Sequence, residues 1–134
     1  GWTYSAHPIG AAAGVANLRL IDELGLVKNA AGTGRYFRDA MADALGGHAH
    51  VGDIRGEGML CAVEFVEDRD SRAFFDPGDK VGARIAAALA AEGVIGRAMP
   101  QGDILGFAPP MCLSKGEADT IVAAMRKAVA SVLG

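Results

Sequence analysis

The chain has 134 residues, 51% of them hydrophobic, and carries a formal net charge of −3 at pH 7. This length suits one domain with a single hydrophobic core. The slightly acidic balance excludes the broad basic surface of a nucleic-acid-binding domain, so small molecules and protein surfaces are the expected partners. No apolar run approaches the length of a membrane span and no secretory signal is visible, so we expect a cytoplasmic protein without a membrane partner.

Two helices are predicted in the first third of the chain. Pro8 suits the first turn of a helix, and the alanine-rich stretch that follows it ends near Glu23, before Gly25. A second helix is expected over Leu26–Leu45, because one stripe of apolar side chains recurs there at helical spacing before a pair of glycines. The stripe consists of Leu26, Ala30, Phe37, Met41 and Leu45.

The pattern changes to that of a hairpin after residue 50. Residues 51–66 predict two strands joined around Gly56–Gly58, because apolar side chains alternate with others along the second strand. The alternating apolar side chains are those of Met59, Cys61, Val63 and Phe65. The charged segment Glu67–Gly78 is interpreted as a surface loop, and a helix is expected from about Asp79 to Glu92.

Two short strands and a final helix complete the chain. The strands are expected over Val94–Met99 and Ile104–Phe107, with a turn between them. A capping box from Ser114 to Glu117 marks the start of the last helix. The order α-α-β-β-α-β-β-α predicts an α+β fold, in which a small antiparallel sheet of about four strands is packed with helices and preceded by a long helix.

The cysteines and histidines predict neither a disulfide nor a metal site. Cys61 and Cys112 are far apart, and each lies in an apolar run, which predicts two buried reduced thiols. His48 and His50 have the spacing of a ligand pair, but a metal needs a third or fourth ligand and only Asp53 is near. A solvated turn is therefore the favoured interpretation of the two histidines.

No catalytic set can be completed from these residues. A lysine that forms a Schiff base needs a desolvated, apolar setting, and every lysine here is expected on a helix or at a helix start among polar neighbours. The glycine-rich stretch Arg55–Gly58 leads into a strand rather than a helix, so it predicts a hairpin and an ion pair for Arg55 rather than a phosphate site.

Two features remain as candidate binding residues. Thr3, Tyr4 and Ser5 lie just ahead of a helix start, where free backbone N–H groups favour an anion. Arg97 lies at the end of a predicted strand in an apolar setting, with no acidic neighbour in the sequence. Such an arginine either pairs with a distant carboxylate of the chain or binds the carboxylate of a ligand, and the residues alone leave both interpretations open.

Three motifs in series resemble those of the class III pyridoxal-phosphate aminotransferases, the subgroup III enzymes of fold type I. GWTYSAHP is similar to their segment Gly-aromatic-Thr-aromatic-Ser-x-His-Pro, and VGDIRGEGMLCAVEFV to their Asp-x-Arg-Gly-x-Gly hairpin. VIGRAMPQGDILGFAPPMCLSKGEADTIV resembles their closing pattern, in which an arginine precedes Gly-Asp and a Pro-Pro pair. The likeness covers nearly the whole chain and is strongest to the omega-transaminases of the amine or beta-alanine:pyruvate type.

The resemblance implies a particular place for each part of the chain. Residues 1–25 would be the end of the large cofactor domain with its linking helix, and residues 26–134 the small C-terminal domain. The family forms homodimers with the active sites between subunits. By resemblance, Thr3 binds the phosphate of pyridoxal phosphate held by the neighbouring subunit, Trp2 lines the substrate pocket, and Arg97 is the mobile arginine that pairs with a substrate carboxylate.

The implied reaction moves an amino group from an amine or omega-amino acid to pyruvate or a similar keto acid. The Schiff-base lysine of the family lies upstream of GWTYSAHP, so no catalytic residue is expected in this chain and the fragment is expected to be inactive alone. Pro100 and Gln101 lengthen the usual step between Arg97 and the Gly-Asp pair. The alternatives are a glutamate-1-semialdehyde aminomutase, an ornithine or acetylornithine type of aminotransferase, and a non-catalytic α+β binding or assembly module.

Overall fold

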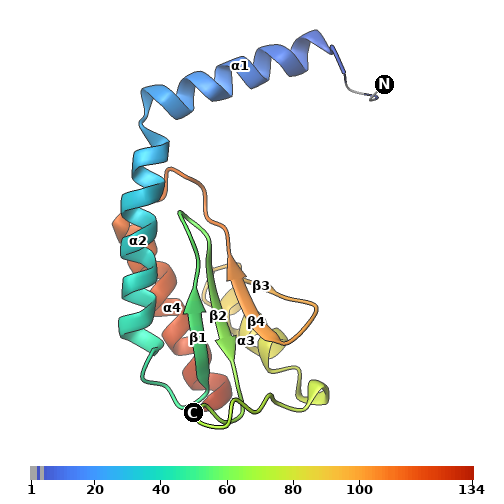
Figure 1. The fold of residues 1–134 in the computed structure, drawn as a ribbon, viewed down its shortest axis with the longest axis vertical. Helices are drawn as coiled ribbons and strands as arrows, with labels where there is room; N and C mark the ends of the chain where they lie inside the picture. The colour runs from blue at the N-terminus through green and yellow to red at the C-terminus, as the bar shows by residue number, and fades with distance from the viewer. Residues whose placement is uncertain (1–2, 4) are drawn as a thin grey trace.

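The structure is a computed structural model that describes Thr3 and residues 5–134. Two helices come first, then a hairpin, a third helix, a second strand pair and a last helix (Figure 1). Their bounds are α1 Pro8–Glu23, α2 Leu26–Leu45, β1 Val51–Arg55, β2 Cys61–Phe65, α3 Val81–Ala91, β3 Arg97–Ala98, β4 Asp103–Phe107 and α4 Lys115–Leu133. Both front helices end where the sequence predicts, at Glu23 and Leu45.

The four strands form one antiparallel sheet in the order β1-β2-β4-β3. Alternate side chains of β2 and β4 are buried on one face, and they share a single core with apolar side chains of α2, α3 and α4. The fully buried core members include Phe37, Met41, Val63, Phe65, Ile85, Leu89, Leu105 and Met125. The expected α+β fold is therefore confirmed, and the three helices leave the other face of the sheet without a layer of their own.

The hairpin between β1 and β2 is joined closely to α2. Gly34 faces the carbonyl of Gly58, and a Cβ at position 34 would overlap that oxygen. Arg38, one turn further along α2, donates from Nη1 to the same oxygen at 2.7 Å. Gly34 thus does not interrupt α2 but permits the helix to approach the hairpin backbone.

The start of α4 is fixed by the predicted capping box. The backbone N–H of Glu117 donates to Ser114 Oγ at 3.2 Å, and the backbone N–H of Ser114 donates to Glu117 Oε2 at 2.8 Å. The amide of Asn29 in α2 donates to the carbonyl oxygens of Met111 at 2.7 Å and Leu113 at 3.0 Å. These bonds hold the segment before α4 against α2.

Three local predictions were wrong. α3 begins at Val81 rather than Asp79, because Lys80 has a φ of 49° and cannot continue a helix. β3 comprises only Arg97 and Ala98, since the preceding Ile95 is 91% exposed and lies outside the ladder. Cys112 is exposed, whereas Cys61 is buried as expected, and both thiols are free.

Helix α1 runs outward from the layer of sheet and helices (Figure 1). None of its residues is buried, and several large apolar side chains along it are exposed, namely Ile9, Val15, Leu18 and Leu20. No helix within the described residues combines the length and the apolar character needed to cross a membrane.

Candidate functional site

Arg97 lies on β3, at one edge of the sheet. Its cross-strand partner is Gly106 of β4, and the next residue, Ala98, is opposite Leu105. Leu105 is fully buried in the core, so Arg97 belongs to the other face, because successive strand residues point to opposite faces. The Arg97 side chain is exposed on the face that the helices do not cover.

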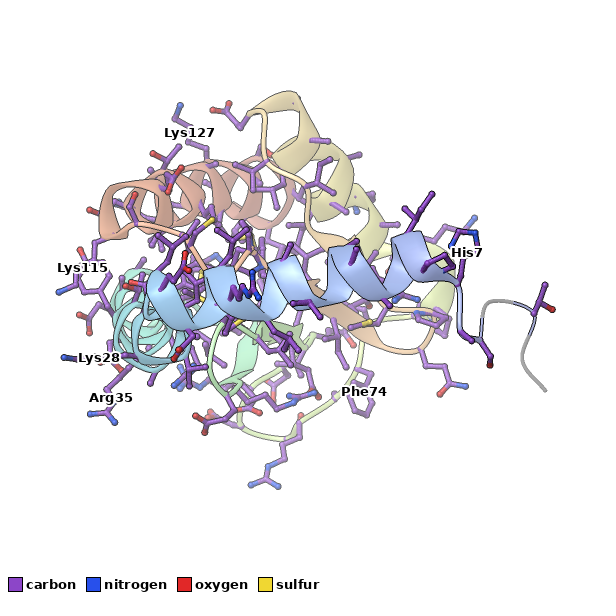
Figure 2. The ribbon with its side chains drawn as sticks, turned by 90° about the horizontal axis from the view of Figure 1, so that it is seen from above. His7, Lys28, Arg35, Phe74, Lys115 and Lys127 are labelled. Carbon is purple, nitrogen blue, oxygen red and sulfur yellow. The ribbon has the colours of Figure 1, made fainter. Side chains whose placement is uncertain are left out.

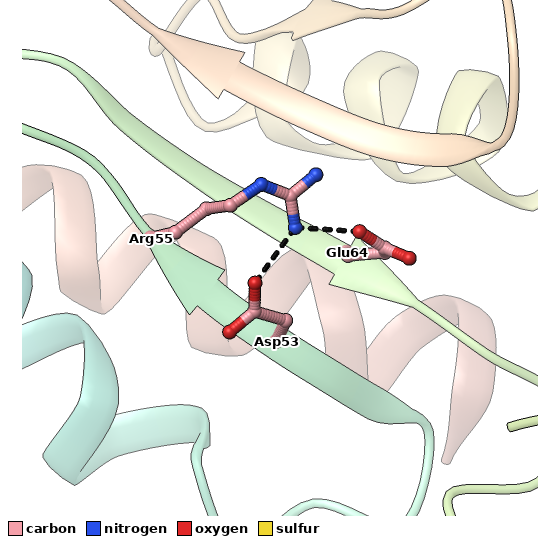
Figure 3. Close-up of polar contacts among 3 residues, drawn as sticks. All are labelled: Asp53, Arg55 and Glu64. Carbon is pink, nitrogen blue, oxygen red and sulfur yellow. Dashed lines mark hydrogen bonds and ion pairs between the residues drawn. The ribbon is translucent and has the colours of Figure 1, made fainter.

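A second arginine on this face, Arg55, is held in ion pairs. Its Nη1 lies 2.8 Å from Asp53 Oδ2 and 2.5 Å from Glu64 Oε2 (Figure 3). The hydrogen bond to Asp53, followed by that to Glu64, raises the pKa of Arg55 above its usual value. The predicted structural role of Arg55 is confirmed, and a part-exposed pair of this kind contributes at most about 1 kcal/mol.

Arg97 has no such partner in the part of the chain that the structure describes. Within Thr3 and residues 5–134, the ion pairs involve Arg55 and Lys127, and none involves Arg97. The register places Arg55, Ala62, Gly106 and Arg97 in one row across the four strands. One end of this row is neutralised by ion pairs, and the other end carries the positive charge of Arg97 on the open face of the sheet.

The turn beside Arg97 is anchored by α3. The backbone N–H of Gly82, at the start of α3, donates to Asp103 Oδ1 at 2.7 Å. A cavity of about 450 Å³ lies between this turn and the loop before α3, lined by Phe74, Phe75, Pro77, Lys80, Gly82, Ala83, Ala98, Met99, Pro100, Gly102 and Asp103. Pro100 and Gln101 lie in the exposed turn, and Gly102 closes it with a φ of 67°. The two additional residues therefore leave the pairing of Arg97 with Gly106 intact.

Thr3 is exposed ahead of α1. The N-cap residue of α1, His7, makes no side-chain hydrogen bond to the helix, and the first turn contains no acidic residue. The backbone N–H groups of this turn thus suit an anion. Trp2 lies outside the described residues. Thr3 precedes α1 in the chain, and α1 runs outward from the layer of sheet and helices that contains Arg97 (Figure 1).

All four lysines are exposed. Figure 2 shows Lys28, Lys115 and Lys127 directed away from the ribbon. Lys127 Nζ pairs with Glu92 Oε2 at 2.8 Å, and Lys115 Nζ lies 4.9 Å from the centre of the Tyr36 ring. None of the four has the desolvated setting that a Schiff-base lysine requires.

The histidine pair forms a turn, as predicted. His50 Nδ1 lies 3.1 Å from the carbonyl oxygen of Val66 and 2.9 Å from that of Glu67. Partial burial, followed by the nearby His50, lowers the pKa of His48 below its usual value. Within Thr3 and residues 5–134, no three ligating side chains come together to hold a metal ion.

Comparison with known proteins settles the family. The sequence model described as aminotransferase class-III matches residues 1–129. The chain belongs to the class-III aminotransferases. It is 52% identical over 132 residues to the diaminobutyrate–2-oxoglutarate transaminase of Halomonas elongata, covering 98% of this chain and 28% of that protein. It is 49% identical over 133 residues to an uncharacterized aminotransferase of Sinorhizobium fredii, covering 99% of this chain and 28% of the relative.

Solved structures agree with this membership. A transaminase obtained by ancestral reconstruction superposes with a TM-score of 0.96 at 52% identity, covering 98% of this chain and 29% of that one. An (S)-enantioselective omega-transaminase from Thermomicrobium roseum superposes with a TM-score of 0.93 at 34% identity. The match covers 100% of this chain and 29% of that one. The chain thus spans less than a third of the class-III aminotransferases that it matches.

Class-III aminotransferases depend on pyridoxal phosphate, and the residues of this chain fit one part of that cofactor. The exposed Thr3 hydroxyl and the uncapped start of α1 suit its phosphate group. No lysine here suits its aldehyde. The motifs in the sequence make Thr3 and Arg97 candidates, but they do not point to Gly106, whose position opposite Arg97 depends on the strand register. Its only signal in the sequence is a glycine inside a predicted strand.

Proposed function

We propose that this chain is the C-terminal part of an enzyme that moves an amino group from an amine or omega-amino acid to pyruvate or a similar keto acid. The observation that carries the proposal is the exposed guanidinium of Arg97, without an ion-pair partner in the described chain, on the open face of the sheet. Membership of the class-III aminotransferases supplies the reaction type.

Arg97 recognises the substrate carboxylate. A guanidinium presents two parallel N–H donors, which match the two oxygens of a keto-acid or amino-acid carboxylate. The Arg97 side chain is exposed and belongs to a two-residue edge strand, so its flexible stem has room to turn away when the second substrate is an uncharged amine. One arginine can therefore serve both halves of the reaction.

The cofactor site is shared between two copies of the enzyme. When bound, pyridoxal phosphate supplies the electron sink for the amino-group transfer. The Thr3 hydroxyl would hold the phosphate group of the cofactor bound by the neighbouring subunit, and Trp2 would line that subunit's substrate pocket. This proposal includes a homodimer, with residues 1–25 belonging to the large domain and its linking helix and residues 26–134 to the small domain. The absence of buried residues from α1 supports that division.

The enzyme is proposed to act in the cytoplasm. Both cysteines carry free thiols, and free thiols persist in a reducing compartment.

A second candidate reaction uses 2-oxoglutarate as the keto acid. The supporting observation is the 52% identity to the Halomonas elongata diaminobutyrate–2-oxoglutarate transaminase. Arg97 suits either keto acid, because both carry the carboxylate that its guanidinium would bind.

The test uses the full-length protein loaded with pyridoxal phosphate. Amine donors and diaminobutyrate are each combined with pyruvate or 2-oxoglutarate, and the rates identify the preferred pair. Arg97→Ala should reduce kcat/KM for the keto acid at least tenfold more than for an uncharged amine. Arg84→Ala, which removes another exposed arginine from α3, is the control. Equal losses for both substrates would refute the carboxylate role of Arg97, and the absence of transamination with every pair would refute the proposed function.

A further inference from the structure

The backbone conformation of β4 does not explain why residue 106 is a glycine. The pairing of β4 with β2 and with β3 is regular, so no bulge lies at this residue. Its φ is outside the left-handed region that favours glycine. A glycine inside a strand weakens the strand, and without a bulge it marks a place where another group approaches closely.

The group that approaches Gly106 is the end of Met99. A Cβ at position 106 would lie 2.7 Å from Met99 Cε, whereas its distance of 3.8 Å from the carbonyl oxygen of Arg97 is an ordinary contact. The backbone N–H of Met99 donates to the carbonyl of Ile104 at 2.9 Å, which places Met99 on the same face as Arg97. The methyl of Met99 therefore fills the space that Gly106 leaves opposite Arg97.

The Met99 side chain, which occupies this space, is able to change conformation. Met99 is 38% exposed, and it is followed by the exposed turn at Pro100 and Gln101 rather than by further strand. Methionine is unbranched and adapts to irregular spaces more readily than other apolar side chains. When the methyl of Met99 withdraws, an apolar space opens over Gly106, directly beside the stem of Arg97.

We propose that Met99 and Gly106 form an adjustable apolar notch that determines which apolar groups the enzyme accepts beside Arg97. The occupant is the apolar substituent of an amine substrate, which displaces the Met99 methyl and lies over Gly106. The inference rests on the proposed function, because it requires that Arg97 faces the substrate.

The experiment compares variants of the full-length protein in transamination to pyruvate from two amines, 1-phenylethylamine and isopropylamine. Met99→Ala enlarges the notch and should raise the ratio of kcat/KM for the larger amine to that for the smaller by about tenfold, the lower end of what one methylene group in a pocket changes. Gly106→Ala narrows the notch and should lower the same ratio by about tenfold. The change should lie mainly in the KM of the larger amine.

Combining the two substitutions tests whether Met99 and Gly106 act together. Once Met99 is truncated, alanine at position 106 no longer meets its methyl group. The effect of Gly106→Ala on the ratio should therefore be at least threefold smaller in the Met99→Ala background than in the wild type.

A matched control is available in the same sheet. A Cβ at Gly52 in β1 would lie 2.8 Å from Cγ1 of Val66, so Gly52→Ala introduces similar crowding at the opposite edge of the sheet from Arg97. This variant should leave the ratio within twofold of the wild type. Thermal unfolding of each variant measures the structural cost separately.

The outcomes separate the notch from the proposed function. Transamination by the wild type and the selective loss in Arg97→Ala test the proposed function, and their failure removes the basis of the notch. Suppose instead that the wild type transaminates and Arg97→Ala shows the selective loss. If the ratio of kcat/KM for the larger amine to that for the smaller then changes no more in Met99→Ala and Gly106→Ala than in Gly52→Ala, the notch alone is refuted. Met99→Ala truncates a part-exposed side chain, so the test does not depend on Gly106→Ala being stable.

Discussion

Replacing Gly34 with alanine should destabilise the protein, although the same change in the middle of a helix usually stabilises it. An alanine in a helix interior is favoured over glycine by about 1 kcal/mol. At position 34 the added Cβ would overlap the carbonyl oxygen of Gly58 and come within 3.2 Å of the backbone nitrogen of Met59. Both atoms belong to the backbone of the hairpin and cannot move aside as a side-chain end does.

The cost is estimated from the contacts that would be lost. Overpacking of a close contact costs about 1–3 kcal/mol. The hydrogen bond from Arg38 to the Gly58 carbonyl, of a kind worth about 1.5–3 kcal/mol, would also be displaced. After subtraction of the helix-propensity gain, Gly34→Ala should lower the free energy of unfolding by about 1.5–5 kcal/mol. This is a large part of the roughly 5–15 kcal/mol that stabilises a typical domain.

Helix α2 provides its own control. Gly32 lies two residues away with nothing within 4 Å of the position of its Cβ. Gly32→Ala should therefore raise the free energy of unfolding by about 0.5–1 kcal/mol. Urea unfolding followed by circular dichroism at a helical wavelength measures both variants. A Gly34→Ala protein as stable as Gly32→Ala would refute the close contact between α2 and the hairpin.

Three further predictions concern thiols, pH and the cofactor. In the native chain a maleimide should modify only Cys112, which is exposed, because burial raises the pKa of the Cys61 thiol to about 11; mass spectrometry counting two adducts before unfolding would contradict this. The backbone and side-chain hydrogen bonds from Ser114 lower the pKa of Glu117, so its contribution to stability is complete above the unfolded pKa of about 4.5 and is lost as pH falls through the lower folded value. Glu117→Gln should therefore flatten the acid side of the stability–pH curve, and an unchanged acid side would argue against the capping box. The 134-residue chain mixed with pyridoxal phosphate and reduced with borohydride should form no stoichiometric, site-specific adduct, because all its lysines are exposed; a single labelled lysine in a peptide map would refute this.

The sequence predicts the fold well where a local pattern determines the structure. The apolar stripe of α2, the alternation along β2 and the capping box at Ser114 each depend on residues a few positions apart, and each is confirmed. The start of α3 was missed because the left-handed conformation of Lys80 has no signature in its residue type. The length of β3 was missed because apolar residues such as Ile95 resemble a strand whether or not a neighbour pairs with them.

The candidate site was likewise predicted only where a local sequence motif marks it. Thr3 and Arg97 were singled out as candidates from motifs, but the lack of an ion-pair partner for Arg97 among the described residues depends on which side chains share its face of the sheet. Gly106 could not be singled out, because its closeness to Met99 follows from the pairing of two strands separated by a turn. Exposure of Cys112 likewise depends on how the segment before α4 is held by Asn29, a residue more than 80 positions earlier.

The uncovered helix α1 has a consequence for how assembly can be measured. A helix of 16 residues with no buried side chain is only marginally stable in water, because its hydrogen bonds barely offset the cost of ordering the backbone. Its amide protons should therefore exchange with solvent rapidly in the isolated chain, while those of α2 and α4, packed on the core, exchange slowly. Any surface that covers Ile9, Val15 and Leu18 would slow exchange in α1 selectively. Hydrogen exchange in this one helix thus reports, residue by residue, whether the rest of the enzyme is in place.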